Sequence, residues 1–127
     1  MRLFKTRDFA RFARKEGIGD AQLCDAIERA ERGLIDADLG GGVIKQRVAR
    51  PGKGRSGGYR TLIVYRTEAR AVFVYGFAKN VKANVTPIEL AALKRLATDY
   101  LGYDAKQVDT HVKNGASTEV NCDGDKV

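Results

Sequence analysis

The fold is decided by the stretch Lys45-Gln46-Arg47-Val48-Ala49-Arg50-Pro51-Gly52-Lys53-Gly54-Arg55-Ser56-Gly57-Gly58-Tyr59-Arg60. It holds six cations and no acid, and its pattern predicts a strand, a glycine-rich turn and the start of a second strand. Alternation places Lys45 and Arg47 on one face of the first strand, where same-face neighbours lie about 7 Å apart. That spacing suits two cations that contact successive phosphates of one nucleic-acid strand.

The stretch has two other interpretations. The first is a solvated hairpin whose charges guard an exposed sheet edge, although guard charges rarely come six together without an acid. The second is a nucleotide-binding loop, because residues 52–57 spell G-x-G-x-x-G. This loop leads into a strand, however, so no helix N-terminus is available to hold a pyrophosphate. The glycines are expected instead to let a sugar-phosphate backbone approach closely.

Downstream of the hairpin turn, the sequence predicts the rest of a sheet and a helix. Residues 59–66 alternate, and residues 71–77 are apolar on both faces, so with residues 43–49 they are expected to form a three-strand meander. Thr86-Pro87-Ile88-Glu89 combines an N-cap, a proline at the first helical position and a capping-box glutamate. It therefore begins a helix, which Gly102 is expected to end.

Upstream, a short strand at residues 2–4 is expected to precede two helices, the first capped by Thr6 and the second by Asp20. Only a few residues around Gly17 join the two helices, so they should pack as an antiparallel hairpin. The predicted fold class is therefore α+β. A small antiparallel sheet, made of the three-strand meander and the N-terminal strand, packs with the N-terminal helix hairpin and a C-terminal helix.

Composition divides the chain into a domain at residues 1–101 and a polar tail at residues 102–127. The tail has few apolar residues and no periodicity, so we expect it to be largely disordered and dispensable for the fold. A disulfide is not expected, because Cys24 falls in a predicted helix and Cys122 in the tail, and their spacing does not suggest a zinc site. Cys24 is expected to be a small core residue. The only histidine, His111, lies in the tail and is given no catalytic role.

Net charge and length bound the function. A chain of 127 residues is expected to be one domain, and a formal charge of +7 favours a polyanionic partner, either nucleic acid or an acidic protein. No apolar run near 18 residues and no secretory leader are visible, which predicts a cytoplasmic protein without a membrane span. Asp36-Ala37-Asp38 lacks the further ligands of a calcium loop and is expected to be a turn, so no metal or cofactor is assigned.

Four cations carry a catalytic hypothesis: Lys45, Arg47, Arg60 and Lys79. Such a set binds phosphate and stabilises the extra charge of a pentacovalent transition state. RNA supplies its own nucleophile, the 2′-hydroxyl, so the protein needs only alignment, charge stabilisation and proton transfer. A lysine can serve as the base and an arginine cannot. Further candidate RNA-binding residues are Arg50, Lys53, Arg55, Tyr59, Asn80 and Lys82.

The series of motifs resembles the RelE/ParE superfamily of toxins, and its closest branch resembles the HigB-like toxins of type II toxin–antitoxin systems. The resemblance spans about residues 2–101 and rests on Lys45-x-Arg47 through Gly54, Gly57-Gly58-Tyr59-Arg60, Tyr75-Gly76-Phe77-Ala78-Lys79-Asn80 and the capped C-terminal helix. It implies a ribosome-dependent endoribonuclease that cuts mRNA in the ribosomal A site, beside rRNA, without a metal. It also implies a cognate antitoxin, and binding of operator DNA only through the toxin–antitoxin complex.

The resemblance assigns roles position by position. Lys45 and Arg47 match two basic residues on the family's catalytic strand, and Arg60 matches an arginine held near the scissile phosphate. Lys79 and Asn80 match a basic pair whose second member is arginine in the better-studied RelE toxins. Arg47 stands where a proposed base is lysine, so Lys45 becomes the expected base. Such toxins tend to carry a tyrosine after this point, and residues 81–101 offer only Tyr100.

Three other functions remain open at this point. A ParE-like protein binds and poisons gyrase without cutting RNA, but that role requires no cationic catalytic face. A non-catalytic basic nucleic-acid-binding module needs charge alone. A basic surface can also serve only to dock an acidic antitoxin, which is expected in any case to cover the face of Lys45 and Arg60.

Overall fold

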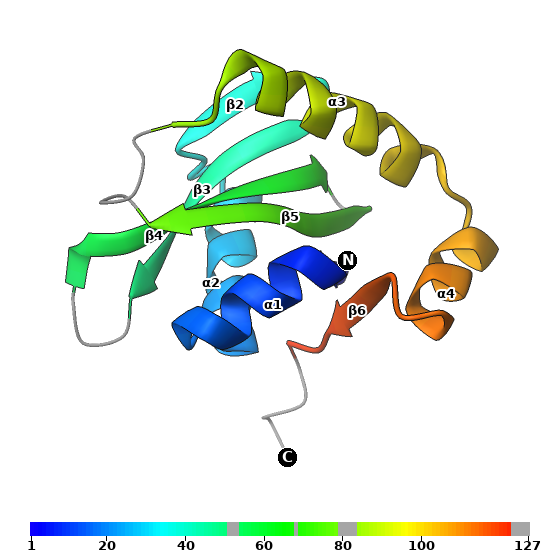
Figure 1. The fold of residues 1–127 in the computed structure, drawn as a ribbon, viewed down its shortest axis with the longest axis horizontal. Helices are drawn as coiled ribbons and strands as arrows, with labels where there is room; N and C mark the ends of the chain where they lie inside the picture. Colours follow the sequence, from blue (N-terminus) through cyan, green and yellow to red (C-terminus); the bar gives the residue numbers. More distant parts are fainter. Residues whose placement is uncertain (51–53, 68, 79–83, 123–127) are drawn as a thin grey trace.

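The structure, a computed structural model, describes residues 1–50, 54–67, 69–78 and 84–122, without the side chains of residues 50 and 54–57. The described residues form four helices and a six-stranded sheet (Figure 1). In chain order the elements are β1 (Arg2–Thr6), α1 (Arg7–Glu16), α2 (Asp20–Glu31), β2 (Ala37–Gly40), β3 (Val43–Arg50), β4 (Gly54–Arg66), β5 (Arg70–Ala78), α3 (Pro87–Gly102), α4 (Ala105–Lys113) and β6 (Ser117–Val120).

The sheet has the strand order β2-β3-β4-β5-β1-β6. β1 runs parallel to β5, and the other neighbouring pairs are antiparallel. The α+β class, the meander of β3, β4 and β5, and the N-terminal strand are confirmed. The two edge strands, β2 and β6, were not predicted, because each is only four residues long and too short to show a period.

Helices cover both faces of the sheet, with α3 crossing one face and the pair α1 and α2 lying on the other (Figure 1). The α1–α2 face has a core that includes Phe9, Leu23 and Phe73. The opposite side, called here the α3 face, has a core that includes Leu62 and Ala97. This two-layer burial follows from strands β4 and β5, whose apolar residues point to both sides.

Close packing of α1 on β5 depends on Gly76. A Cβ atom at this position would lie 2.5 Å from Cε2 of Phe12 and 3.1 Å from Cε2 of Phe9. Real Cβ atoms do not approach that closely, so any side chain at position 76 would push α1 away from the sheet. The aromatic rings of Phe9 and Phe73 then pack with centroids 5.2 Å apart.

The predicted helix boundaries depend on local capping. Thr86 Oγ1 accepts a hydrogen bond from Glu89 N at 3.1 Å and Thr86 N donates to Glu89 Oε1 at 2.8 Å, so the capping box of α3 is confirmed. Gly17, one of the residues that join the two helices, ends α1 in the left-handed conformation with φ of 72°. The N-cap of α2 is Gly19 and not Asp20, which is the first helical residue and forms an ion pair with Lys5.

The expectation of a disordered tail after residue 101 is wrong for the described residues up to 122. Asp104 caps α4 through a bond from Gln107 N at 2.8 Å, and Val108 is buried against the α3-face core. β6 then pairs antiparallel with β1 and buries Val120. The capping box at residues 104–107 was the local signal for this helix, and it outweighs the polar composition.

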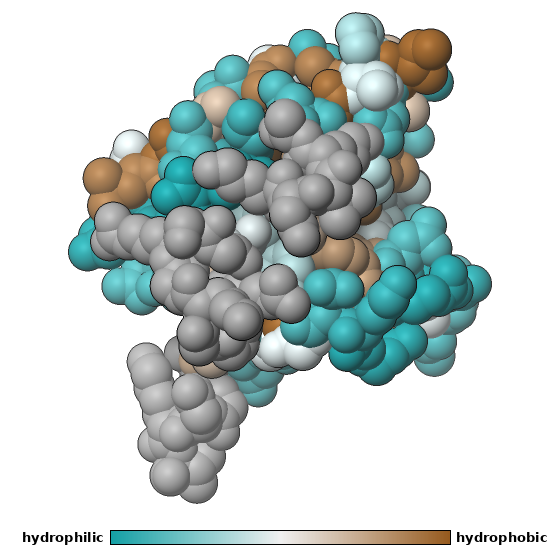
Figure 2. Space-filling model, turned by 60° about the vertical axis from the view of Figure 1, so that its left-hand side comes forward, coloured by the Kyte–Doolittle hydropathy of each residue, from teal (hydrophilic) through white to brown (hydrophobic). Residues whose placement is uncertain are grey.

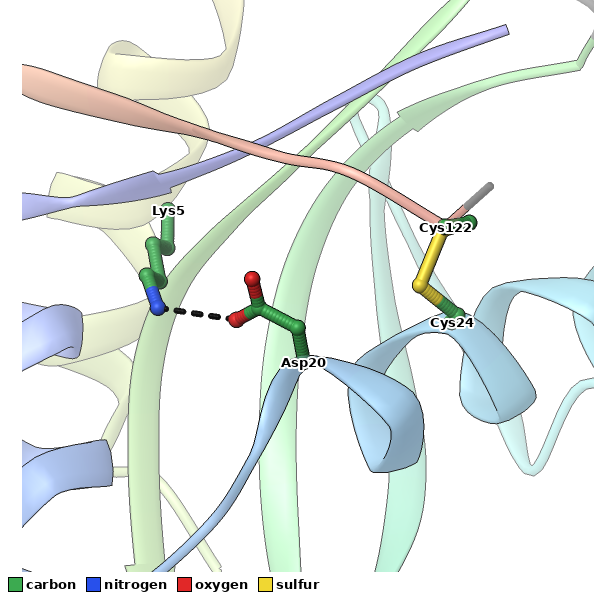
Figure 3. Close-up of a disulfide and its surroundings, with 4 residues drawn as sticks. All are labelled: Lys5, Asp20, Cys24 and Cys122. Carbon is green, nitrogen blue, oxygen red and sulfur yellow. Dashed lines mark hydrogen bonds and ion pairs between the residues drawn. A yellow bond between two sulfur atoms is a disulfide. The ribbon is translucent and has the colours of Figure 1, made fainter. Parts of the chain in front are cut away.

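The expectation that the cysteines stay apart is also wrong, because Cys24 and Cys122 form a disulfide (Figure 3). β6 carries the chain along β1 to α2, so the two Cα atoms lie 5.7 Å apart although 98 residues separate them in sequence. In the same region, Lys5 of β1 forms an ion pair with Asp20 of α2 at 3.0 Å. Cys24 is half-buried and packs against the core, as expected for its place on α2.

Arg2 of β1 also holds the C-terminal segment, through ion pairs with α4 and β6. Its guanidinium bonds Asp109 of α4 at 2.9 Å and Glu119 of β6 at 3.0 Å. The hydrogen bond from Arg2 lowers the pKa of Glu119.

Among the described residues, no helix is both long and apolar enough to cross a membrane.

Candidate functional site

Lys45, Arg47 and Arg60 lie on the α3 face of the sheet. Side chains alternate along β3, so Lys45 and Arg47 share a face with buried Val43, while Ile44 and Val48 belong to the opposite core. Arg60 likewise shares its face with Leu62. The structure thus brings together three of the four cations in the catalytic hypothesis.

Arg47 and Arg60 are direct neighbours across the β3–β4 pair. The backbone N–H and C=O of Arg47 bond to groups on the other side of β3, Asp36 and Arg29. Arg47 and Arg60 therefore form a non-hydrogen-bonded pair, the kind in which Cα atoms approach to about 4.5 Å and side chains are closest. Two like charges opposite each other in this way repel.

Both guanidinium groups also hold buried donors. Arg47 Nε and Arg60 Nη1 are shielded from solvent, and neither has a hydrogen-bond partner among the residues that the structure describes. A buried donor without an acceptor costs about 1–3 kcal/mol. A phosphate would satisfy both donors and offset the repulsion, because arginine bonds phosphate oxygens with its planar fork. The arrangement has the electrostatics of an anion site.

Lys45 extends this site along β3. It lies opposite Leu62 in the register, one same-face position from the Arg47–Arg60 pair. The residue is half-buried, and its amine forms no ion pair with any described residue. Of the three cations that the structure places here, it is the one that can release a proton.

An aromatic pair borders the cations on β5, and sequence analysis missed it. Tyr75 lies opposite Leu62, and Phe77 lies opposite Arg60, with ring centroids 5.8 Å apart. The apolar run of β5 gave no sign of which residues face α3. A register shift in the β4–β5 pair places both Val74 and Tyr75 against the α3-face core, so simple alternation fails here.

Tyr59, a candidate RNA-binding residue, is in the wrong place for that role. It is fully buried in the α1–α2 core, where its ring packs on Phe12 and its hydroxyl donates to Glu16 Oε1 at 3.0 Å. Arg50 and Arg55 lie at the ends of β3 and β4 beside the turn, with side chains outside the described residues. Lys53, Lys79, Asn80 and Lys82 lie outside the described residues altogether.

The surface near the β3–β4 turn is mixed in polarity. Figure 2 shows the molecule from this side. On the described surface, hydrophilic residues are extensive and hydrophobic residues form separate patches. A polar, charged ligand fits such a surface better than an apolar one.

The comparison with protein families matches this chain to the model described as the RelE toxin of the RelE/RelB toxin–antitoxin system, over residues 1–120. The match covers the cationic strands, and it extends past residue 101 through α4 to the last residue of β6. In the comparison with curated proteins, none matches the chain.

Proposed function

Because the chain belongs to the RelE toxin family of toxin–antitoxin systems, we propose that it is a ribosome-dependent endoribonuclease that cleaves mRNA without a metal. Membership of the family gives it an antitoxin as partner. The proposal places the protein in the cytoplasm, where it acts on mRNA in the ribosomal A site and contacts rRNA. We assign it to the HigB-like branch on its motif series. In the proposal, the toxin reaches operator DNA only as part of the complex with its antitoxin.

One observation carries the proposal: Arg47 and Arg60 face each other with buried donors that have no partner among the described residues. In the proposed reaction the 2′-oxygen attacks the adjacent phosphorus and the bond from phosphorus to the 5′-oxygen breaks. Lys45 takes the proton of the 2′-hydroxyl, while Arg47 and Arg60 bond the phosphate oxygens as charge grows on them. The products are a 2′,3′-cyclic phosphate and a 5′-hydroxyl.

The remaining residues have supporting roles in the proposal. Lys79 is the second amine, which can return a proton to the leaving 5′-oxygen. Arg50, Lys53, Arg55, Asn80 and Lys82 bind RNA phosphates around the turn and the end of β5. Tyr75, which is half-buried, offers a ring face beside the cations on which a base can stack, and buried Phe77 packs against that ring.

Two candidate functions compete with cleavage. A ParE-like gyrase poison has no need for buried arginine donors on this face, so the Arg47–Arg60 pair counts against it. A non-catalytic nucleic-acid-binding module needs positive charge alone, and only a test for cleaved mRNA separates it from the proposed enzyme. The acidic antitoxin is proposed to cover the same face, because complementary charge speeds association.

The test is to induce the wild-type chain in cells and to map mRNA 5′ ends together with the DNA-damage response. Codon-phased cuts that carry a 5′-hydroxyl are expected, without a damage response. The double variant Arg47→Ala/Arg60→Ala should abolish the cuts, whereas Arg66→Ala, an exposed arginine six residues along β4, should keep them. A damage response without cuts would overturn the proposal in favour of gyrase poisoning.

A further inference from the structure

The backbone of Arg47 is held by two charged side chains where a strand would ordinarily lie. β2 pairs with β3 as far as Ala37 opposite Lys45, and the same register would place residue 35, which is outside β2, opposite Arg47. On this side of β3 the carboxylate of Asp36 accepts a hydrogen bond from Arg47 N at 2.6 Å. Arg29 of α2 donates from Nη2 to the carbonyl oxygen of Arg47 at 2.5 Å.

Both of these side chains are themselves held in place. Arg29 Nε bonds Asp25, one helical turn earlier, at 3.1 Å. Asp36 N donates to Oε1 of Gln46 at 3.0 Å, and Gln46, which is fully buried, also donates to the carbonyls of Ala26 and Leu34. The residue between Lys45 and Arg47 thus fixes the loop that presents Asp36.

We propose that Arg29 and Asp36 are positioning residues, which fix the peptide groups of Arg47 so that its guanidinium stays opposite Arg60. The inference rests on the proposed function of that arginine pair. Hydrogen bonds with one charged partner are about twice as strong as neutral ones, so two of them can replace strand pairing at this point. Neither residue contacts the substrate, and their effect reaches RNA only through Arg47.

A purely structural role is the competing explanation, and it predicts different measurements. If the two bonds only fasten α2 to the sheet, their loss lowers stability and leaves the Arg47 side chain where it is. If they position Arg47, their loss frees its guanidinium and lowers the rate of the chemical step. Misplacement by about 1 Å can cost as much as 100-fold in rate.

The experiment compares Arg29→Met, which removes the donor, with Arg29→Lys, which keeps the charge, and Asp36→Asn, which keeps an acceptor. Arg32→Met is the matched control, because Arg32 lies exposed at the end of the same helix. The first readout is independent of activity: nitrogen-15 NMR of the Arg47 Nε–Hε group, with inorganic phosphate as the probe. The second is single-turnover cleavage on programmed ribosomes.

In Arg29→Met, exchange of the Arg47 Nε proton is expected to quicken at least tenfold and the cleavage rate to fall about tenfold. Half-saturating ribosome concentration should stay within twofold, and Arg29→Lys should recover most of the rate. The cleavage rate of Asp36→Asn should lie between those of Arg29→Met and Arg29→Lys. Arg32→Met should have the proton exchange and the cleavage rate of wild type. Unchanged Arg47 proton exchange in Arg29→Met overturns the inference. If the wild-type chain does not cleave at all, the proposed function fails instead, while the NMR readout still tests whether Arg29 positions Arg47.

Discussion

Tyr75 donates a hydrogen bond from its hydroxyl to Oε2 of Glu89 at 3.0 Å. The other oxygen of the same carboxylate, Oε1, accepts from Thr86 N at 2.8 Å and closes the capping box of α3. One glutamate therefore both begins a helix and orients an aromatic ring on the cationic face. The start of α3 and the candidate site are held in a fixed relation, although the two residues come from different layers of the fold.

Lys45→Ala is expected to lower single-turnover cleavage on programmed ribosomes by at least about 100-fold, the lower end for loss of a general base. Ribosome affinity should change little, because the cations around it remain. Lys15→Ala, which removes an exposed lysine from α1 in the other layer, is the control and should cleave normally. Near-wild-type cleavage by Lys45→Ala would exclude it as the base and shift that role to Lys79.

Arg60→Met is expected to abolish cleavage and yet to raise the free energy of unfolding by about 1 kcal/mol. The substitution removes a buried donor without a described partner and its repulsion with Arg47. Urea unfolding measures the change, with Arg66→Met as the exposed control, which should stay within about 0.5 kcal/mol. Phosphate should stabilise the wild-type chain more than Arg60→Met. A lower unfolding midpoint for Arg60→Met would show that the arginine stabilises the fold.

Truncation after Gly102 is expected to lower the melting temperature by roughly 10 °C or more, because it removes α4 and β6 and exposes Tyr100 and Phe4. Calorimetry in reducing buffer measures this without a contribution from the disulfide. Val120→Ala, at a buried position of β6, should destabilise more than Thr118→Ala, at an exposed one. An unchanged melting temperature after truncation would mean that α4 and β6 do not stabilise the domain.

Cys122→Ser is expected to lower the free energy of unfolding under oxidising conditions by about 2–4 kcal/mol, the usual range for a disulfide that closes a long loop. The bond joins residues 98 positions apart, so its loss frees much of the unfolded chain. Urea unfolding with and without dithiothreitol measures the effect. Dithiothreitol should lower the free energy of unfolding of wild type to that of Cys122→Ser, and it should leave the value of the variant unchanged. A reductant effect of equal size on both proteins would show another cause.

Acidification is expected to weaken the attachment of β6 through Glu119. Its pKa is lowered in the folded chain by hydrogen bonds from Arg2, so the contribution is complete above the ordinary glutamate pKa of 4.5 and is lost as pH falls through the lower folded value. Glu119→Gln should therefore narrow the difference between urea midpoints measured at pH 7 and pH 3. A difference of the same size in the variant would assign the acid sensitivity to other groups.

Local signals explain what could be predicted from the sequence. The hairpin of β3 and β4 and the capped start of α3 depend on residues within a few positions of one another, so alternation and capping rules find them. Alternation also placed Lys45 and Arg47 on one face of their strand, and the observed register with β4 adds Arg60 to that face. Tyr75 was missed because a register shift between β4 and β5 breaks the alternation of side chains next to this residue.

Contacts between distant parts of the chain explain what could not be predicted. β6 pairs with β1, more than 100 residues away, and this pairing together with the packing of α2 on the sheet brings Cys122 to Cys24. Similarly, the bonds of Arg29 and Asp36 to Arg47 depend on how α2 lies against the sheet. The polar composition of the tail suggested disorder. Composition gives the number of apolar residues, but it does not show that Val120 and its neighbours pair with the free edge of β1.

The position of β1 between β5 and β6 sets the order in which the protein can fold as it is synthesised. β1 leaves the ribosome well before its partners on either side, residues 70–73 and 117–120, are translated. The two strands of the hairpin that carries Arg47 and Arg60 are adjacent in sequence, so they can pair as soon as both have been synthesised. A growing chain can therefore form its cationic hairpin before its sheet is complete, and β6 pairs with β1 only after the hairpin has been synthesised.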